Sequence, residues 1–452
     1  MAACTAAPPR CCPRTQPNGV FRPRGRGTEW TMAFERVGSN DLTILATDHG
    51  QVPMNIGAVL VFGSGSNGRQ MLTTLTQRLC TVPRFRQRLV RFGALSGPPV
   101  WVDDSAFDPA RHTAVHELGG RDGLLDRAAD VVCRRLPSDR PLWAMHLFEG
   151  LPGGGFAVVI VLHHVVADGM GGLAVLAALA DGVPLPEWVP SPPPTRREVV
   201  RDASRRRRAA VASLGRTLRT TLSGLREMGF RGRRPVAPTS LLRPTTGRRR
   251  VRVVDVALEP VVLAAHRLGV TVNDLIVTAV AGTLFDVLGA RGEFPEQVVV
   301  SVPVSARSAG TDLGNQVGAV PVAVPRTSRL ASVAEQTRRA KQQPRGSSAA
   351  VLSVVFRSLA ALRLGQFFID RQRLVHTFET NLRGPAQRVA MAGTPLTQIV
   401  PIAVNPGNVG VSFDVLSYAG RLTISVVADP VVAPEVHRVA ELLGTHLADL
   451  TA

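Results

Sequence analysis

Apolar and polar positions follow one another along the chain in a way that predicts strands and helices in alternation. Runs rich in Val, Ile and Leu between turn residues predict strands, and apolar residues at three- and four-residue steps predict helices. We expect strands at residues 55–62, 99–104, 142–150, 155–164, 251–258, 297–305, 317–324, 398–404, 408–416 and 421–427, and one within 107–118. We expect helices at residues 69–90, 122–135, 170–181, 259–268, 272–288, 330–343, 346–364 and 433–450. This mixture predicts an α/β protein.

A segment of different composition separates the two halves of this pattern. Residues 183–195 are rich in Pro, and residues 196–250 hold 17 Arg against three acidic residues. Residues 1–31 hold five Arg against one Glu, so the two basic segments account for nearly all of the formal net charge of +19. Because 452 residues exceed one ordinary core, we expect more than one domain. The predicted organisation is a disordered basic extension (1–31), an N-terminal domain (32–182), a Pro/Arg-rich crossover (183–250) and a C-terminal domain (251–452).

The basic crossover also contains an apolar stripe. Val211, Leu214, Leu218, Leu222 and Leu225 recur at three- and four-residue steps, which predicts an amphipathic helix within 196–228. One interpretation is a solvated linker helix that packs on the body of the protein. Another is attachment to an anionic membrane or lipid-droplet surface. Nucleic-acid binding is disfavoured, because the segment has almost no aromatic residues to stack on bases.

Cysteine usage and the lengths of the apolar runs favour a cytoplasmic protein. Three of the five cysteines, Cys4, Cys11 and Cys12, lie near the N-terminus, and the spacing predicts no disulfide framework. No run of 18 uncharged apolar residues predicts a membrane-spanning helix, and the N-terminus lacks the apolar core of a signal peptide. The expected location is the cytoplasm, with peripheral attachment to a membrane or a lipid inclusion.

Two adjacent histidines follow the predicted strand at 155–164, in the stretch HHVVADG. Successive side chains on a strand point to opposite faces, so His163 and His164 are expected to face different surroundings. This argues against a metal site that uses both, and favours one histidine that orients and one that reacts. Asp168 is a candidate N-cap of the next helix, and Gly169 would let backbone or ligand approach closely.

The stretch resembles the His-His-x-x-x-Asp-Gly motif of the coenzyme A-dependent acyltransferase superfamily. Further blocks, in this order, resemble the bacterial wax ester synthase/diacylglycerol acyltransferase family within it. They are PMNIGAVLVF (53–62), VPRFRQRL (82–89), RPLWAMHLFEGL (140–151), VNDLIVTAVAGTL (272–284), VPVSAR (302–307), LGNQVGAVPVAVP (313–325) and TNLRGPAQRVAMAGTPLTQIVP (380–401). The resemblance covers nearly the whole chain from about residue 34. It departs in detail at Leu-Arg before Gly-Pro, which bears on acceptor preference.

This resemblance implies a two-domain α/β fold of the chloramphenicol acetyltransferase type, with a tunnel between the domains in which two substrates meet. It implies that His164 is the general base, that His163 orients the site, and that Asp168 forms a structural ion pair with an arginine. No metal and no cofactor are implied, since acyl-CoA is a substrate.

Acyl transfer from a thioester to an alcohol needs a base for the hydroxyl proton and donors for the oxyanion. His164 suits the first task, because imidazole titrates near neutral pH. Backbone N–H groups of residues 169–172 suit the second, with Asn273 as a further candidate. The chain has no Gly-x-Ser-x-Gly elbow, which favours direct transfer over a serine acyl-enzyme.

Other residues have competing interpretations. Asn273 and Asp274 begin a helix, with Asn273 as its cap, or act at the domain interface. Pro141, Leu142 and Trp143 start a strand and pack in the core, or line an acyl tunnel. Arg307 is a surface charge or binds the phosphates of the coenzyme. The pair His112 and His116 has metal-ligand spacing on a helix, but nothing nearby completes a metal site.

The predicted function is transfer of a long-chain acyl group from acyl-CoA to diacylglycerol, which makes triacylglycerol, with long-chain alcohols as further acceptors for wax ester synthesis. A second hypothesis is a condensation-type or polyketide-associated acyltransferase that uses a carrier-bound thioester. A third is a degenerate homologue that only binds lipid surfaces, which the intact HHVVADG disfavours. The expected partners are therefore acyl-CoA, diacylglycerol or a long-chain alcohol, and an anionic lipid surface.

Overall fold

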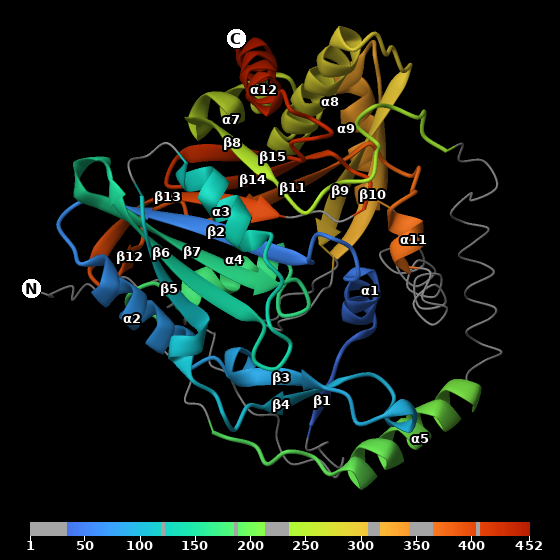
Figure 1. The fold of residues 1–452 in the computed structure, drawn as a ribbon. Coiled ribbons are helices and arrows are strands. Elements are labelled where there is room, and N and C mark those ends of the chain that lie inside the picture. The colour runs from blue at the N-terminus through green and yellow to red at the C-terminus, as the bar shows by residue number, and fades with distance from the viewer. Residues whose placement is uncertain are drawn as a thin grey trace, which may run out of the picture. The chain divides into compact units, whose positions relative to one another are not determined.

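The structure, a computed structural model, describes residues 34–118, 123–184, 189–212, 235–305, 317–342, 365–403 and 407–452 (Figure 1). Several predicted features lie outside these residues: the extension 1–31, the helix 346–364, Arg307 and most of the apolar stripe of the crossover.

The strands in these ranges form two six-stranded sheets and one small sheet. The first sheet has the order β12 (Ala390–Met391), β13 (Thr394–Ala403), β2 (Asn55–Phe62), β7 (Gly155–His163), β6 (Trp143–Leu151) and β5 (Thr113–Glu117). The second has the order β10 (Val317–Pro325), β9 (Gln297–Ser305), β11 (Thr377–Arg383), β14 (Val411–Tyr418), β15 (Arg421–Ala428) and β8 (Arg250–Ala257). The small sheet holds β1 (Glu35–Arg36), β4 (Val100–Asp103) and β3 (Gln87–Val90).

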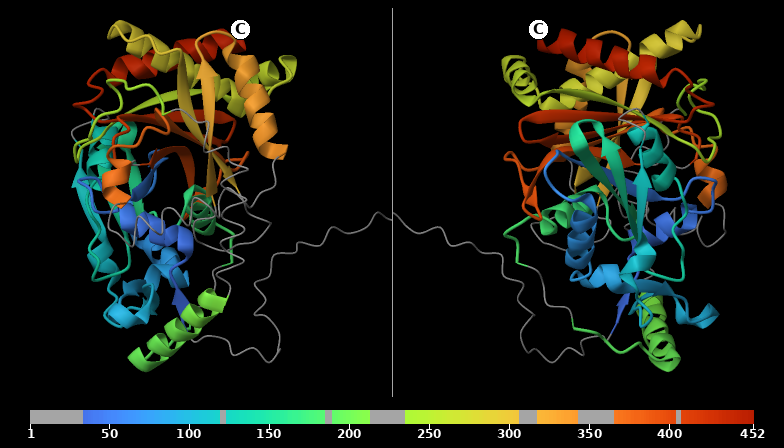
Figure 2. Two further views of the ribbon diagram at one scale, coloured as in Figure 1. Left: turned by 90° about the vertical axis from the view of Figure 1, so that its right-hand side faces the viewer. Right: turned by 60° about the vertical axis from the view of Figure 1, so that its left-hand side comes forward.

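Helices in the described ranges pack against the sheets or against one another. They are α1 (Ser39–Thr47), α2 (Gly68–Leu79), α3 (Leu124–Val132), α4 (Gly169–Ala178), α5 (Arg196–Ala212), α7 (Leu258–Arg267), α8 (Val272–Ala290), α9 (Arg329–Gln342), α11 (Gly365–Ile369) and α12 (Val436–Thr451). Figures 1 and 2 show α7, α8 and α12 packed together beside the second sheet. The helix α8 is long and apolar enough to span a membrane, but 78% of its apolar window is buried inside the protein, as expected for a core helix.

Strand β7 is the centre of the first sheet, and its sequence explains its place. All nine of its residues are buried. Ile160 and Leu162 pack in the core that contains Leu75 of α2, whereas Val159 and Val161 pack on the other face with Val132 of α3. A strand covered on both faces needs apolar residues at every position, which accounts for the continuous run.

The first sheet combines strands from both predicted domains. Strand β13 comes from the predicted C-terminal domain, yet it pairs antiparallel with β2, with Ile399 opposite Leu60. The predicted boundary at residue 251 therefore does not separate the two sheets, because a late strand completes the early sheet.

Four element predictions need correction. The predicted helix 69–90 ends at Leu79, since Pro83 starts a 3-10 turn and Gln87–Val90 pairs with β4. Strand β7 ends at His163, so His164 lies in the following loop. Strand β11 was not predicted, because its sequence, TFETNLR, is polar at most positions; only Thr377 and Glu379 of this strand are buried. Strand β13 starts at Thr394, four residues before the predicted start.

The described part of the crossover forms α5, which a buried ion pair joins to the small sheet. Arg36 Nε donates to Asp202 Oδ2 at 2.6 Å, and both side chains are buried. The same guanidinium donates to the carbonyl oxygens of Ser96 (2.7 Å) and Val199 (2.7 Å). Val199 and Ala203 are the buried apolar residues of α5, so the apolar contact is small. The ion pair therefore fixes the orientation of this helix.

We expect Asp202→Ala to lower the free energy of unfolding by about 3–5 kcal/mol, because it leaves the buried Arg36 guanidinium without its counter-charge. Urea unfolding and limited proteolysis of residues 196–212 measure the effect. The control is Glu335→Gln, which breaks exposed ion pairs on α9 and should cost about 0–1 kcal/mol. Equal effects of the two substitutions would contradict the anchoring role.

Candidate active site

Backbone hydrogen bonds to the residues just before β6 and β2 hold the two histidines in place. The N–H of His163 donates to Leu142 O at 3.0 Å, and the N–H of His164 donates to Met54 O at 2.7 Å. Leu142 lies directly before β6 and Met54 directly before β2. The turn continues with Val166 N–H donating to His163 O at 2.8 Å. The position of the histidines at the edge of the sheet therefore depends on both strands that flank β7.

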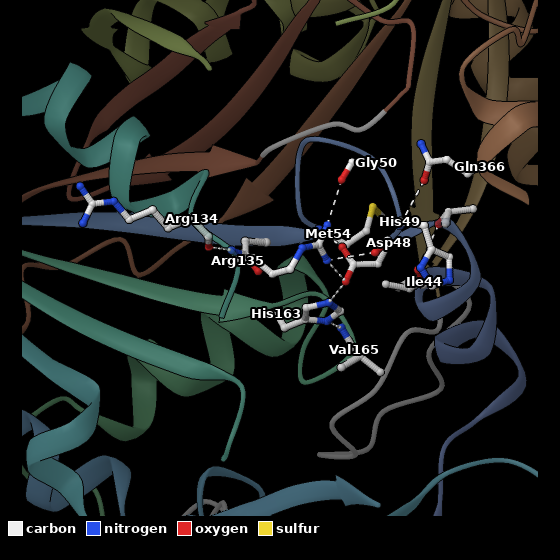
Figure 3. A network of polar contacts seen from close by, with 12 residues as sticks. Ile44, Asp48, His49, Gly50, Met54, Arg134, Arg135, His163, Val165 and Gln366 are labelled. Carbon is white, nitrogen blue, oxygen red and sulfur yellow. Dashed lines mark hydrogen bonds and ion pairs between the residues drawn. The ribbon is translucent and has the colours of Figure 1, made fainter. Parts of the chain in front are cut away.

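The ring of His163 is held by two hydrogen bonds (Figure 3). Its Nδ1 accepts the backbone N–H of Val165 at 3.1 Å. A nitrogen that accepts carries no proton, so the proton of the neutral ring lies on Nε2. This Nε2–H donates to Asp48 Oδ2 at 3.2 Å. The arrangement fixes both the orientation and the tautomer of a buried ring, as an orienting residue requires.

Asp48 is the partner that sequence reasoning did not find. It follows α1, and it also accepts Arg135 Nη1 at 2.7 Å and the Met54 N–H at 2.9 Å. Burial alone would raise the pKa of Asp48, but the hydrogen bonds from His163 and Met54 and the charge of Arg135 hold that pKa below its usual value. The carboxylate is therefore ionised at neutral pH. Its place at the end of a short helix, far from the motif in sequence, gave no signal of this role.

His164 faces a different space, a cavity of about 110 Å³ between the two large sheets. The cavity wall comes from β2, β7 and β13 of the first sheet, from α4, and from β11 and β14 of the second. Most of the lining is aliphatic. Burial lowers the pKa of His164, and this effect outweighs the opposing attraction of Asp168. The imidazole is therefore neutral at pH 7, the form that can accept a proton.

Asp168 caps α4. Its Oδ1 accepts the N–H of Gly171 at 2.7 Å, and its backbone oxygen accepts the N–H of Gly172 at 2.7 Å. Two of the predicted oxyanion donors thus already have acceptors, which leaves the N–H groups of Gly169 and Met170 as candidates. The predicted arginine ion pair of Asp168 stays a prediction.

Gly169 has a steric reason to be glycine. A Cβ at this position would lie 3.3 Å from Leu382 Cδ2 on β11, which is closer than ordinary packing allows. The start of α4 therefore lies against β11 of the second sheet, and Gly169 and Leu382 both line the cavity.

The residues at the start of α8 have structural roles in the described part of the chain. Thr271 is the N-cap and forms a capping box with Asp274, so the prediction that Asn273 is the cap was wrong. Asp274 also accepts the Thr337 hydroxyl at 2.7 Å. Asn273 Oδ1 accepts Asn381 Nδ2 at 2.8 Å, which links α8 to β11. Neither Asn273 nor Asp274 is among the residues found to line the cavity.

The Pro141, Leu142 and Trp143 block starts β6 and packs in the core. Leu142 and Trp143 are buried, and the indole N–H of Trp143 donates to Phe85 O at 2.8 Å. The His112 ring stacks on Trp143 at 4.3 Å between centroids, whereas His116 contacts His146. Within the described ranges, no three His, Cys, Asp or Glu residues gather in a way that could hold a metal ion.

Comparison with known proteins identifies the family. The model of the wax ester synthase/diacylglycerol acyltransferase catalytic domain matches residues 37–276, and the model of the C-terminal domain of the same family matches residues 313–451. This chain belongs to that family. The probable diacylglycerol O-acyltransferase Tgs1 of Mycobacterium tuberculosis is 30% identical over 430 residues, which cover 89% of this chain and 92% of the relative.

Solved structures confirm the predicted two-domain α/β fold. The wax ester synthase/diacylglycerol acyltransferase of Marinobacter aquaeolei matches with a TM-score of 0.66 and 21% identity, over 92% of this chain and 98% of that chain. The first condensation domain of the calcium-dependent antibiotic synthetase, in complex with a substrate analogue, matches with a TM-score of 0.59 and 20% identity, over 92% and 96%. This chain is therefore an acyltransferase of that family, and condensation domains share its fold.

We expect Asp48→Asn to lower kcat for thioester cleavage about ten- to a hundredfold, the range that follows from losing a hydrogen bond to a charged group. The neutral amide would accept a weaker hydrogen bond from the His163 Nε2–H than the carboxylate does and would lose the ion pair with Arg135, so the ring would be held less firmly. Steady-state kinetics with palmitoyl-CoA measure this, and the KM for acyl-CoA should stay the same. Asp139→Asn, at a fully exposed acid, is the control. An unchanged kcat in Asp48→Asn would contradict the role of Asp48.

Proposed function

We propose that this acyltransferase moves a long-chain acyl group from acyl-CoA to the free hydroxyl of diacylglycerol and so makes triacylglycerol. The observation that carries the proposal is His164 at the wall of an apolar cavity, next to an oriented His163. Burial lowers the pKa of His164, which favours the neutral form that a base needs. The family supplies the chemical class, since it implies acyl-CoA and an acceptor. Relatives over nearly the whole chain are named as probable diacylglycerol O-acyltransferases, which favours this acceptor.

The proposed reaction is a direct transfer. The acceptor hydroxyl lies at His164, whose unprotonated ring nitrogen takes the hydroxyl proton while the oxygen attacks the thioester carbonyl carbon. A C–O bond forms, and the carbonyl oxygen becomes an oxyanion. The C–S bond then breaks, and the imidazolium returns the proton to the leaving thiolate. The products are an ester and free coenzyme A, with no net proton released.

The surroundings of His164 support the other requirements of this reaction. Backbone N–H groups of Gly169 and Met170, at the positive end of α4, are placed at the start of the helix that flanks the cavity and would bind the oxyanion. Aliphatic side chains of β2, β7 and β13 would bind hydrocarbon and exclude water, which limits hydrolysis of the thioester. The same chemistry extends to long-chain alcohols, with wax esters as products.

We expect wild-type protein to release thiol from palmitoyl-CoA only when dioleoylglycerol is present, with triacylglycerol as the lipid product. His164→Ala should lower this activity about 10²–10⁴-fold, the usual contribution of a general base. Because burial lowers the pKa of His164, the acid limb of the kcat/KM profile should lie below pH 6.5, the ordinary value for histidine. Thiol release and chromatography of the lipids measure both.

His266→Ala, at an exposed histidine of α7, is the control and should leave activity unchanged. Full activity of His164→Ala would remove His164 as the base. Transfer only from a carrier-bound thioester would favour a condensation-type enzyme, and lipid binding by the wild type without any thioester cleavage would favour a homologue that only binds surfaces.

We also propose that α5 attaches this protein, from the cytoplasm, to an anionic lipid surface. The helix exposes Arg197, Arg201, Arg205 and Arg208. They follow one another at steps of four, four and three residues, so they share one face of the helix. This face lies opposite the buried Val199 and its neighbours. A stripe of arginines on a helix fixed to the body is suited to anionic headgroups, where each charge contributes about 1 kcal/mol. Diacylglycerol dissolves in such membranes, so attachment would bring the enzyme to its acceptor.

We expect Arg205→Gln/Arg208→Gln to weaken binding to phosphatidylglycerol-containing vesicles roughly ten- to thirtyfold, the effect of two surface charges. Sedimentation with vesicles at low salt measures it, and added salt should reduce wild-type binding. The matched control, Arg338→Gln/Arg339→Gln, removes two exposed arginines from α9 and should bind like the wild type. Equal losses in both double variants would indicate net charge alone and contradict attachment through α5.

A further inference from the structure

A carboxyl group lies in the wall of the cavity that His164 faces. Among the described residues that line this cavity, polar side chains come from His164, Thr380 and Asp414, and all the others are Gly, Ala, Pro, Val, Leu or Ile. Asp414 is 2% exposed. It lies in the middle of β14, opposite Thr380 of the parallel strand β11. An acid at this depth, in an aliphatic wall, needs partners that compensate for its burial.

The two hydrogen bonds that Asp414 accepts leave room for further hydrogen bonds at its carboxyl oxygens. Its Oδ1 accepts the Thr380 hydroxyl at 2.9 Å, and its Oδ2 accepts the Ala403 N–H at 2.7 Å. Each carboxyl oxygen has two lone pairs, so each oxygen can take one further hydrogen bond or a proton. These two bonds come from β11 and β13, and they fix the carboxyl group in the cavity wall.

The protonated and ionised forms of Asp414 can bind different polar groups. Burial raises the pKa of Asp414 to about 7, against the lowering effect of the bonds from Ala403 and Thr380. Both forms are therefore present near neutral pH. The protonated form donates to a carbonyl oxygen, and the ionised form accepts from a hydroxyl group.

We propose that Asp414 determines acceptor specificity by hydrogen-bonding the glycerol ester portion of diacylglycerol while the reacting hydroxyl lies at His164. The inference rests on the function proposed above and adds the residue that selects the acceptor. A long-chain alcohol has one polar group, which the reaction places at His164, so its methylene groups would leave Asp414 against hydrocarbon. A site that hydrogen-bonds a substrate group rejects analogues that lack this group. Asp414 therefore favours diacylglycerol over simple alcohols.

Glu379 supplies a matched control in the neighbouring position of β11. It is fully buried, and neither of its carboxyl oxygens has a hydrogen-bond partner among the described residues. Side chains alternate along a strand, so Glu379 points to the opposite face from Thr380. Phe413, its partner across the strand pair, belongs to the core that contains α8. Burial and the nearby Asp414 raise the pKa of Glu379 to about 8. It is thus a buried acid outside the cavity wall.

The test is the ratio of kcat/KM for dioleoylglycerol to kcat/KM for hexadecanol, with palmitoyl-CoA as donor. This ratio does not depend on the fraction of correctly folded enzyme. Asp414→Leu, which is close to Asp in shape, should lower the ratio about tenfold or more, mainly through a higher KM for dioleoylglycerol. Asp414→Asn keeps a donor and an acceptor, so its ratio should stay within about threefold of wild type, and Glu379→Gln should leave the ratio unchanged. Asp414→Ala replaces the Leu variant if the latter does not fold.

An unchanged ratio in an active Asp414→Leu or Asp414→Ala variant would overturn the assignment, as would an equal fall in Glu379→Gln. Failure of the proposed function has a different signature: the wild type would transfer to neither acceptor. In that case, thermal stabilisation by 1,2-dioctanoylglycerol, without acyl-CoA, still tests Asp414. Stabilisation of the wild type that Asp414→Leu loses supports the assignment, and stabilisation that the variant retains overturns it.

Discussion

The pairing of β13 with β2 is the interaction on which the site depends. It brings β13, from the last third of the chain, into the first sheet beside β2. On its other side, β2 pairs with β7, which ends at His163. The same β13 contributes Ile399 and Pro401 to the cavity wall, and the N–H of its last residue, Ala403, donates to Asp414 on the second sheet. One strand thus closes a sheet, lines the cavity and bonds to the facing sheet. These residues of β13 form part of the cavity wall that His164 faces, and burial there lowers the pKa of His164.

The same arrangement separates two histidines that are adjacent in sequence. His163 is the last residue of a strand buried on both faces, so its side chain must lie within the protein, where Asp48 and Val165 satisfy both of its nitrogens. His164 is the first residue of the loop and turns to the cavity. The first ring has hydrogen-bond partners at both nitrogens, whereas most of the residues that line the cavity beside the second ring are aliphatic. This difference gives one ring a fixed tautomer and the other a lowered pKa, so orientation and reactivity are assigned by surroundings and not by residue type.

The sequence predicted those parts of the structure that depend on local pattern. The continuous apolar run of β7 and the capping residues before α4 were readable, because burial on both faces and helix capping leave marks within a few residues. Long-range partners left no such marks. Asp48 meets His163 across more than a hundred residues. Strand β11 was missed because Glu379 and Thr380 interrupt its apolar pattern, and β13 was assigned to its own half because nothing local indicates that it crosses. Asp414 was missed for a related reason, since an acid within an apolar strand resembles a surface position.

Glu379 and Asp414 show what burial requires of an acidic side chain. Both lie in the same pair of parallel strands, and burial raises the pKa of each. A raised pKa in an acid means that the folded state holds a proton that the unfolded chain releases, so each group lowers stability as the pH rises from its unfolded pKa to its folded pKa. Asp414 offsets part of this cost with two hydrogen bonds, and Glu379 has none among the described residues. The acid that faces the cavity is therefore the one that the fold holds in place. A carboxyl group fixed by two strands, at a pKa near neutrality, can match either a carbonyl or a hydroxyl of a ligand without rearranging, and this makes it a better selector than a mobile surface charge.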